Sequence, residues 1–120
     1  RQDNTNAVIA LTKKIIKKYG CEVINMGDFN MRSFDEAYHL MVDSGILTDS
    51  RFVAARDGVL KRIGHELGSS KLSEGAATRT IDYFFVTDQV NILRNRACIN
   101  MTIACSTDHF PIYTDISLNG

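Results

Sequence analysis

The sequence lacks several features that mark common classes of protein. Its 120 residues include no tryptophan and one proline, and no apolar run approaches the roughly 18 residues of a membrane span. No signal peptide is visible. Lys plus Arg and Asp plus Glu number 14 each, so the chain has no net basic field to attract nucleic acid. The charge therefore neither supports nor excludes a nucleic-acid partner.

Cysteine is also scarce. The three cysteines, Cys21, Cys98 and Cys105, have no close metal-type spacing, and their odd number disfavours a disulfide framework. We interpret them as free core thiols, which weakly favours a reducing compartment such as the cytoplasm. The hydrophobic content of 44% and the absence of low-complexity sequence predict one small folded domain with a core of its own.

The pattern of the apolar residues that are present predicts an α+β fold, with one mixed or mostly antiparallel sheet and flanking helices. Residues 3–19 have the amphipathic period of a helix, which Gly20 can end. A Ser-x-x-Glu capping box at Ser33 predicts a second helix that runs through Val42 and stops at Gly45.

Four further segments have the composition of strands. We expect these at residues 21–26 (short and buried), 80–86, 90–104 (one long or broken strand paired as a hairpin) and 112–118. Two segments lie between them. Residues 46–63 are ambiguous, with enough apolar positions for a short helix but no clean period, and residues 64–77 have the composition of an exposed loop.

Polar side chains of a particular kind stand at the ends of these expected strands. Gly27-Asp28-Phe29-Asn30 follows the first strand, and its carboxylate and carboxamide can point into one pocket. An ionised Asp can hold a hard cation or take a proton from water, and an amide can donate to a developing oxyanion. Turns also prefer Gly, Asp and Asn, so this motif is weak evidence by itself.

Two later stretches agree with the first. Asp82 interrupts the apolar strand Thr80–Val86, where a buried carboxylate needs a partner. Asp108 and His109 come just before the last strand. If the later strands run antiparallel to the first, all these groups converge on one sheet edge. Asp82 could then fix the His109 imidazole, which leaves Asp28 and Asp108 as candidates for a divalent cation or a water.

Three motifs taken together resemble the carboxyl-terminal half of the endonuclease/exonuclease/phosphatase family, whose fold is of the deoxyribonuclease-I type. They are Gly-Asp-Phe-Asn, Ile-Asp-Tyr-Phe-Phe-Val and Ser-Thr-Asp-His-Phe-Pro-Ile. The resemblance implies that residues 1–120 are that half of a single domain, and half of a four-layer α/β-sandwich. It implies a phosphoester substrate, Mg²⁺ or Mn²⁺, and in-line attack of water on phosphorus. Whether the substrate is DNA, RNA, a lipid head group or a sugar phosphate stays open.

The same resemblance implies a role for each matching residue. Asp28 would position or activate the water and bind metal, and Asn30 would hydrogen-bond the phosphate. Asp82 would orient His109, which would stabilise the pentacoordinate phosphorus or transfer a proton, while Asp108 would bind or neighbour the metal.

The chain departs from the family pattern in length, since the family's amino-terminal half supplies an Asn and the Glu that is the principal metal ligand. Two hypotheses therefore follow. One is a divalent-metal-dependent phosphoester hydrolase, phosphodiesterase or nuclease-like, in the full-length parent; the other is an isolated non-catalytic fragment that oligomerises or needs its amino-terminal half. We also expect a homo-oligomer, formed through a sheet face that the other half would otherwise cover.

Overall fold

The computed structural model describes residues 2–54, 70–71, 77–79, 81–97, 109 and 112–118. The chain is an α+β protein with antiparallel strand pairs and flanking helices, as the sequence predicts. In chain order the elements are α1 (Gln2–Tyr19), β1 (Ile24–Asp28), α2 (Glu36–Val42), β2 (Thr48–Asp49), α3 (Ser50–Ala54), β3 (Ser70–Lys71), β4 (Ala77–Arg79), β5 (Asp82–Val86), β6 (Val90–Ala97) and β7 (Ile112–Leu118).

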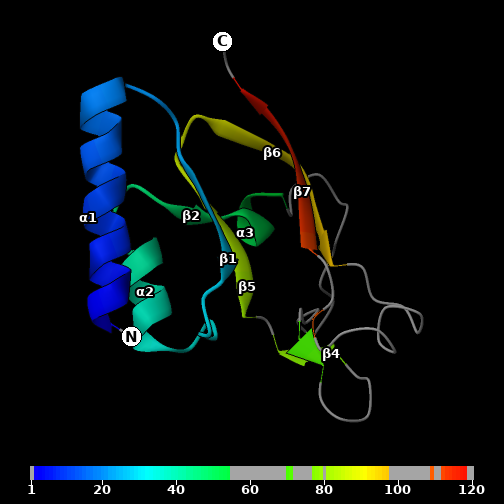
Figure 1. The fold of residues 1–120 in the computed structure, drawn as a ribbon. Helices are drawn as coiled ribbons and strands as arrows, with labels where there is room; N and C mark the ends of the chain where they lie inside the picture. Colours follow the sequence, from blue (N-terminus) through cyan, green and yellow to red (C-terminus); the bar gives the residue numbers. More distant parts are fainter. Residues whose placement is uncertain are drawn as a thin grey trace.

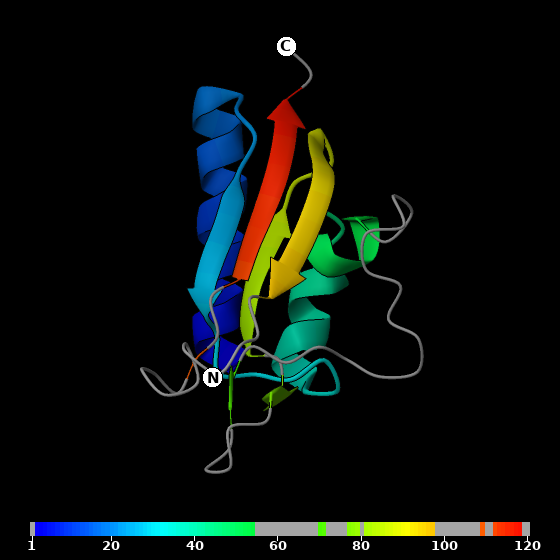
Figure 2. The same cartoon turned by 90° about the vertical axis from the view of Figure 1, so that its right-hand side faces the viewer.

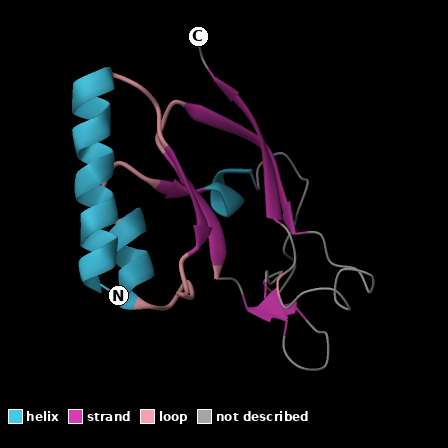
Figure 3. Ribbon diagram, viewed as in Figure 1, coloured by secondary structure: helices cyan, strands magenta, loops and turns pink. Residues whose placement is uncertain are grey.

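The strands are divided among three sheets, where the sequence analysis expects one. The described strands pair in the orders β1-β5-β2, β3-β4 and β6-β7, and each pairing is antiparallel. Helices α1 and α2 lie on one side of the β1-β5-β2 sheet and the β6-β7 hairpin lies on the other (Figures 1 and 3). The division arises because the chain turns at Thr87–Gln89 and the β6-β7 hairpin folds back over β5 without pairing with it. Phe84 of β5 and Ile116 of β7 pack there against a buried cluster of Val86, Val90 and Ile92.

Helix α1 is held to the sheet by a polar contact within its mostly apolar inner face. The Thr12 hydroxyl donates to the Val8 carbonyl at 2.8 Å and accepts a hydrogen bond from the Asn25 amide at 3.1 Å. The helix ends at Gly20, whose positive φ of 60° supplies the left-handed residue that closes many helices. The predicted end of this helix is therefore confirmed.

The core on the helix side is built around two aromatic residues of β5. Tyr83 and Phe85 are buried, their rings stack at 5.1 Å, and Phe29 meets both rings edge-on. Helix α2 contributes Ala37, Tyr38 and Met41 to this cluster, and Met31 and Leu47 complete it. Burial of apolar area of this kind is the main favourable term in folding.

A buried ion pair supports the same core. The Arg51 guanidinium donates to Asp49 through Nε and Nη2, at 3.0 and 2.8 Å from Oδ2, and both side chains are almost fully buried. The Tyr38 hydroxyl donates to the same oxygen at 2.8 Å. Burial, followed by the charge of Asp49, raises the pKa of Tyr38 well above its ordinary value, although Arg51 opposes the shift.

The opposite face of the sheet is less well covered. Ile24, Met26 and Asp28 of β1 are paired in register with Val86, Phe84 and Asp82 of β5, so all six side chains share this face. The hairpin covers β5, but β1 stands to the side of β7 in Figure 2, and Ile24 and Met26 are exposed. The expectation of a buried strand at residues 21–26 is wrong, because the hairpin reaches over β5 and leaves β1 at the edge.

At the end of the sheet away from Asp28, hydrogen bonds from Thr87 join the segment before β1 to the end of β5. The Thr87 hydroxyl donates to Glu22 at 2.7 Å and accepts from the Val23 amide at 3.0 Å. The Thr87 amide in turn donates to the Val23 carbonyl at 3.1 Å. The register of the two strands is thus fixed at this end by side chains as well as by the ladder.

Two other sequence predictions need correction. The capping box at Ser33 does not form: α2 begins at Glu36 after Asp35, and no side chain caps it. Asp35 accepts instead from the Arg32 amide at 2.8 Å, which makes a turn before the helix. Cys21 is exposed rather than in the core, because it precedes β1 on the surface. Cys98, Cys105, Asp108 and most of the loop at 64–77 lie outside the described residues.

None of the helices in the described part of the chain has both the length and the apolar character needed to cross a membrane.

Candidate active site

The candidate site lies where β1 ends and β5 begins. Asp28 is the last residue of β1 and Asp82 the first of β5, and the antiparallel register places them directly opposite each other. The predicted convergence of the two carboxylates on one sheet edge is therefore present. The alternation of the strands puts both on the face opposite the helices.

His109 joins these two carboxylates from a distant part of the sequence. Its Nδ1 lies 2.8 Å from Asp82 Oδ2, and its Nε2 lies 3.7 Å from Asp28 Oδ2. The hydrogen bond that the sequence analysis expects between Asp82 and the imidazole is thus present. Because Asp82 accepts at Nδ1, it holds a proton on that nitrogen and directs Nε2 toward Asp28.

The side chains of Asp82, His109 and Asp28 differ in how much of their surface is exposed to solvent. The side chain of Asp82 is 16% exposed, that of His109 34% and that of Asp28 41%. The carboxylate that holds the imidazole is therefore the most enclosed, and the one beside Nε2 is the most open to solvent. A ligand can reach Asp28 and His109 together.

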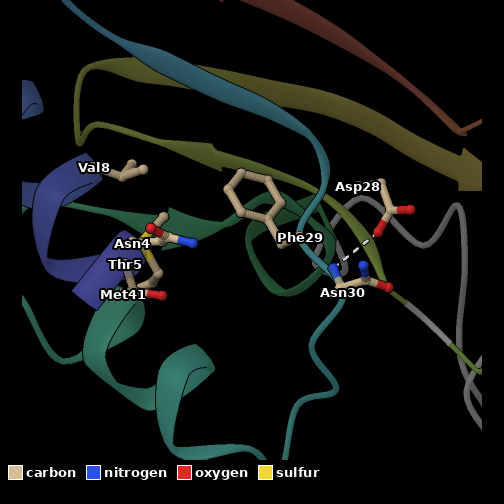
Figure 4. Close-up of a pocket in the computed structure, with 7 residues that line it drawn as sticks. All are labelled: Asn4, Thr5, Val8, Asp28, Phe29, Asn30 and Met41. Atoms are coloured by element: carbon tan, nitrogen blue, oxygen red, sulfur yellow. Dashed lines mark hydrogen bonds between the residues drawn. The ribbon is translucent and has the colours of Figure 1, made fainter. Parts of the chain in front are cut away.

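The turn after β1 places Asn30 beside Asp28. Asn30 has a φ of 53°, and it is the only non-glycine residue with positive φ in the described part of the chain. Its backbone N–H donates to Asp28 Oδ1 at 2.8 Å, the contact drawn in Figure 4. Asn is one of the few residues that adopt this conformation readily, because its short amide bonds locally.

An open pocket of about 550 Å³ lies next to this turn, on the helix side of the sheet. Figure 4 shows the Phe29 ring on the same side of the turn as Val8 of α1 and Met41 near the end of α2. The lining residues are Asn4, Thr5, Val8, Asp28, Phe29, Asn30 and Met41. The sequence gives no signal for Asn4 or Thr5, since they resemble ordinary residues of a first helical turn.

The donor atoms present suit a hard cation. Asp28, Asp82 and His109 each offer one ligand atom, and these atoms lie within 4.8 Å of one another. Asp82 is committed to the imidazole, so the exposed carboxylate of Asp28 is the group best placed to bind metal. Mg²⁺ is commonly held by one or two carboxylates with waters and substrate phosphate, so this donor set fits it. The metal role of Asp108 stays a prediction.

No model of a known protein family and no curated protein matches the sequence. Solved structures do match the fold. An endonuclease/exonuclease/phosphatase family protein from Bacteroides thetaiotaomicron superposes with a TM-score of 0.71 at 18% identity, over 97% of this chain and 45% of that one. A mannosyl-6-phosphatase from B. thetaiotaomicron gives 0.75 at 18% identity, over 95% and 44%.

A third structure, an endonuclease/exonuclease/phosphatase from Bacteroides vulgatus, gives a TM-score of 0.69 at 20% identity, over 98% of this chain and 45% of that one. The chain thus has the fold of a portion of the endonuclease/exonuclease/phosphatase proteins. It spans less than half the length of these structural neighbours.

Proposed function

We propose that this chain carries half of the active site of a divalent-metal-dependent phosphoester hydrolase, in which water attacks phosphorus in line with the leaving oxygen. The observation that carries the proposal is the arrangement of three side chains where β1 ends and β5 begins. His109 Nδ1 lies 2.8 Å from Asp82 Oδ2, and His109 Nε2 lies 3.7 Å from Asp28 Oδ2. The chain would be the carboxyl-terminal half of the complete domain, and the activity would belong to the whole.

His109 is the acid and the charge-stabilising group in this proposal. Asp82 accepts from Nδ1–H and fixes the ring, so that in the imidazolium form Nε2–H can donate to a phosphoryl oxygen or to the departing oxygen. The enclosed position of Asp82 strengthens its hold on the ring, because a lower local dielectric strengthens a charge-assisted hydrogen bond.

Asp28 and Asn30 act beside His109, at the attacking water and at a non-bridging phosphoryl oxygen. Asp28 is exposed and close to Nε2, so it can orient a water or accept its proton. Asn30 follows on the same turn, and its side-chain NH₂ would donate to a non-bridging phosphoryl oxygen. Hydrogen-bond donors fixed before the reaction stabilise developing charge without reorganising.

Asp28, with Asp108, would hold Mg²⁺ or Mn²⁺, and the bound cation would supply Lewis-acid stabilisation of charge on the phosphoryl oxygens. The family's remaining metal ligands would come from the part of the domain that this chain does not include.

The name of one structural neighbour bears on the substrate class. This neighbour is named a mannosyl-6-phosphatase, which supports phosphomonoesters of hydroxylated compounds as candidates alongside phosphodiesters. The formal net charge of zero gives no added support to a nucleic-acid substrate.

The test is hydrolysis of p-nitrophenyl phosphate and bis(p-nitrophenyl) phosphate with Mg²⁺ or Mn²⁺, by the chain and by His109→Ala and Asp82→Asn. We expect turnover to fall about 10²- to 10⁴-fold in His109→Ala, the range for losing a general acid. His39→Ala is the matched control, because His39 is exposed on α2. A chelator should abolish turnover.

Turnover that survives in His109→Ala, or that a chelator leaves unchanged, would contradict the proposal. The alternative is that the chain is a non-catalytic piece without its other half. An inactive chain whose activity is restored by the complementary half of the domain would support that alternative. The reaction would still be phosphoester hydrolysis.

A further inference from the structure

We infer that Tyr83 is the positioning residue for the turn that carries Asn30. The catalytic meaning of this inference rests on the proposed function, but its structural content does not. Tyr83 lies on β5 beside Asp82 and faces the helices, so it is not part of the candidate site itself.

The contact is a buried hydrogen bond behind the turn. The Tyr83 hydroxyl donates to the Met31 carbonyl at 2.8 Å, and both residues are 1% exposed. Met31 directly follows Asn30, so this bond fixes the backbone on the far side of Asn30. On the near side, the Phe29 amide donates to the Ile81 carbonyl at 2.9 Å.

This support matters because the Asn30 backbone is in the left-handed region, with a φ of 53°. Asn tolerates this conformation better than most residues, but it still costs free energy in a residue with a Cβ, and surrounding contacts stabilise it. The hydrogen bond from Asn30 N–H to Asp28 is exposed and therefore a weaker restraint. The buried bond to Met31 is the stronger one, since breaking it would leave a carbonyl unpaired in the core.

The Tyr83 ring is in turn fixed from other sides. Arg51 lies over it at 5.0 Å, and the rings of Tyr38 and Phe85 lie at 5.5 and 5.1 Å. Arg51 is itself paired with buried Asp49. The hydroxyl therefore has little freedom to follow Met31 if the turn moves, and the turn must conform to the core.

Strand β5 then fixes both parts of the site with adjacent residues. Asp82 points to the outer face and holds His109, while Tyr83 points to the helix side and holds the turn of Asn30. The relative position of the imidazole and the Asn30 amide is set by the pleat of one strand.

The test compares Tyr83→Phe with Tyr38→Phe by amide hydrogen exchange. Both variants delete one hydroxyl from a buried tyrosine, but the Tyr38 hydroxyl bonds to Asp49, away from the turn. In Tyr83→Phe we expect the Asn30 amide to exchange about tenfold faster relative to the Thr87 amide, the scale set by one buried hydrogen bond. Thr87 is the reference because its amide bonds to Val23 at the opposite end of the β1–β5 pair.

A general loss of stability would speed exchange at Thr87 as much as at Asn30, and that result would overturn the inference. So would an unchanged Asn30 amide in Tyr83→Phe, or an equal relative effect in Tyr38→Phe.

Turnover provides the second measurement. In Tyr83→Phe the kcat for the aryl phosphates should fall several-fold with KM little changed, while Tyr38→Phe stays near the wild type. If the wild-type chain alone shows no turnover, kcat is compared on the chain combined with the complementary half of the domain, and the exchange experiment decides the role of Tyr83 in either case.

Discussion

The two faces of the β1–β5 pair differ more than the two strands do. On the helix side Tyr83 and Phe85 are buried among aromatic rings and helix α2, and the polar groups there are bonded to one another. On the opposite side Met26 is 70% exposed, and this face ends in the two carboxylates of the candidate site. The same strands therefore supply a packed core from one face and the candidate site from the other.

The first prediction compares the effect on stability of truncating one residue on each face. Phe85→Ala should lower the free energy of unfolding by about 3–5 kcal/mol, because Phe85 is fully buried and its loss leaves a cavity. Met26→Ala should change it by no more than about 0.5 kcal/mol at concentrations where the chain is monomeric, because Met26 is then 70% exposed. Urea denaturation followed by circular dichroism measures both. Equal effects would show that another chain covers the outer face.

A second prediction concerns that outer face in solution. We propose that two copies of the chain associate through the face that carries Ile24 and Met26, since exposed neighbouring apolar residues favour association. Met26→Glu should weaken the association about 10- to 100-fold, the scale of burying one Met side chain.

Light scattering and sedimentation at micromolar concentration measure this, with Phe34→Glu as the control. Phe34 is also 70% exposed, but it precedes α2 and lies off the β1 face. A monomeric mass for the unmodified chain, or an equal effect of Phe34→Glu, would count against association through this face.

The last prediction concerns how stability depends on pH, through one tyrosine on the helix side of the sheet. The pKa of Tyr38 is raised in the folded chain by burial and by Asp49, so the neutral phenol is favoured there. Its stabilising effect is complete below the ordinary tyrosine pKa of about 10 and is lost as the pH rises above it, because the unfolded chain ionises first.

The free energy of unfolding should therefore fall by roughly 1 kcal/mol per pH unit above 10, and Tyr38→Phe should show less of this fall. Denaturant titrations across alkaline pH measure it. The same slope in both proteins would mean that Tyr38 does not govern the alkaline behaviour.

Much of the fold follows from local pattern. The amphipathic period gives α1, the aromatic and β-branched run gives β5, and both lie within two residues of their expected bounds. The pairing of Asp82 with His109 could also be predicted, because a carboxylate in an apolar strand needs a partner. These features depend on neighbours in sequence or on one strong physical requirement.

What the sequence did not reveal depends on the packing of distant elements. The burial of Asp49 and Arg51 falls within the segment that showed no clean period. The exposure of Met26 could not be foreseen, because an apolar strand pattern does not say which strand the hairpin covers. The hydroxyl of Tyr83 gave no signal either, since an aromatic residue in a strand is ordinary by composition.

The register that places Asp28 opposite Asp82 has a consequence for the stability of the sheet. Two carboxylates at directly paired positions repel each other and weaken the pairing of the two strand ends. The imidazole of His109 lies 2.8 Å from one carboxylate and 3.7 Å from the other, so in its protonated form it offsets this repulsion. The pairing of β1 with β5 thus depends in part on a residue close to the end of the chain.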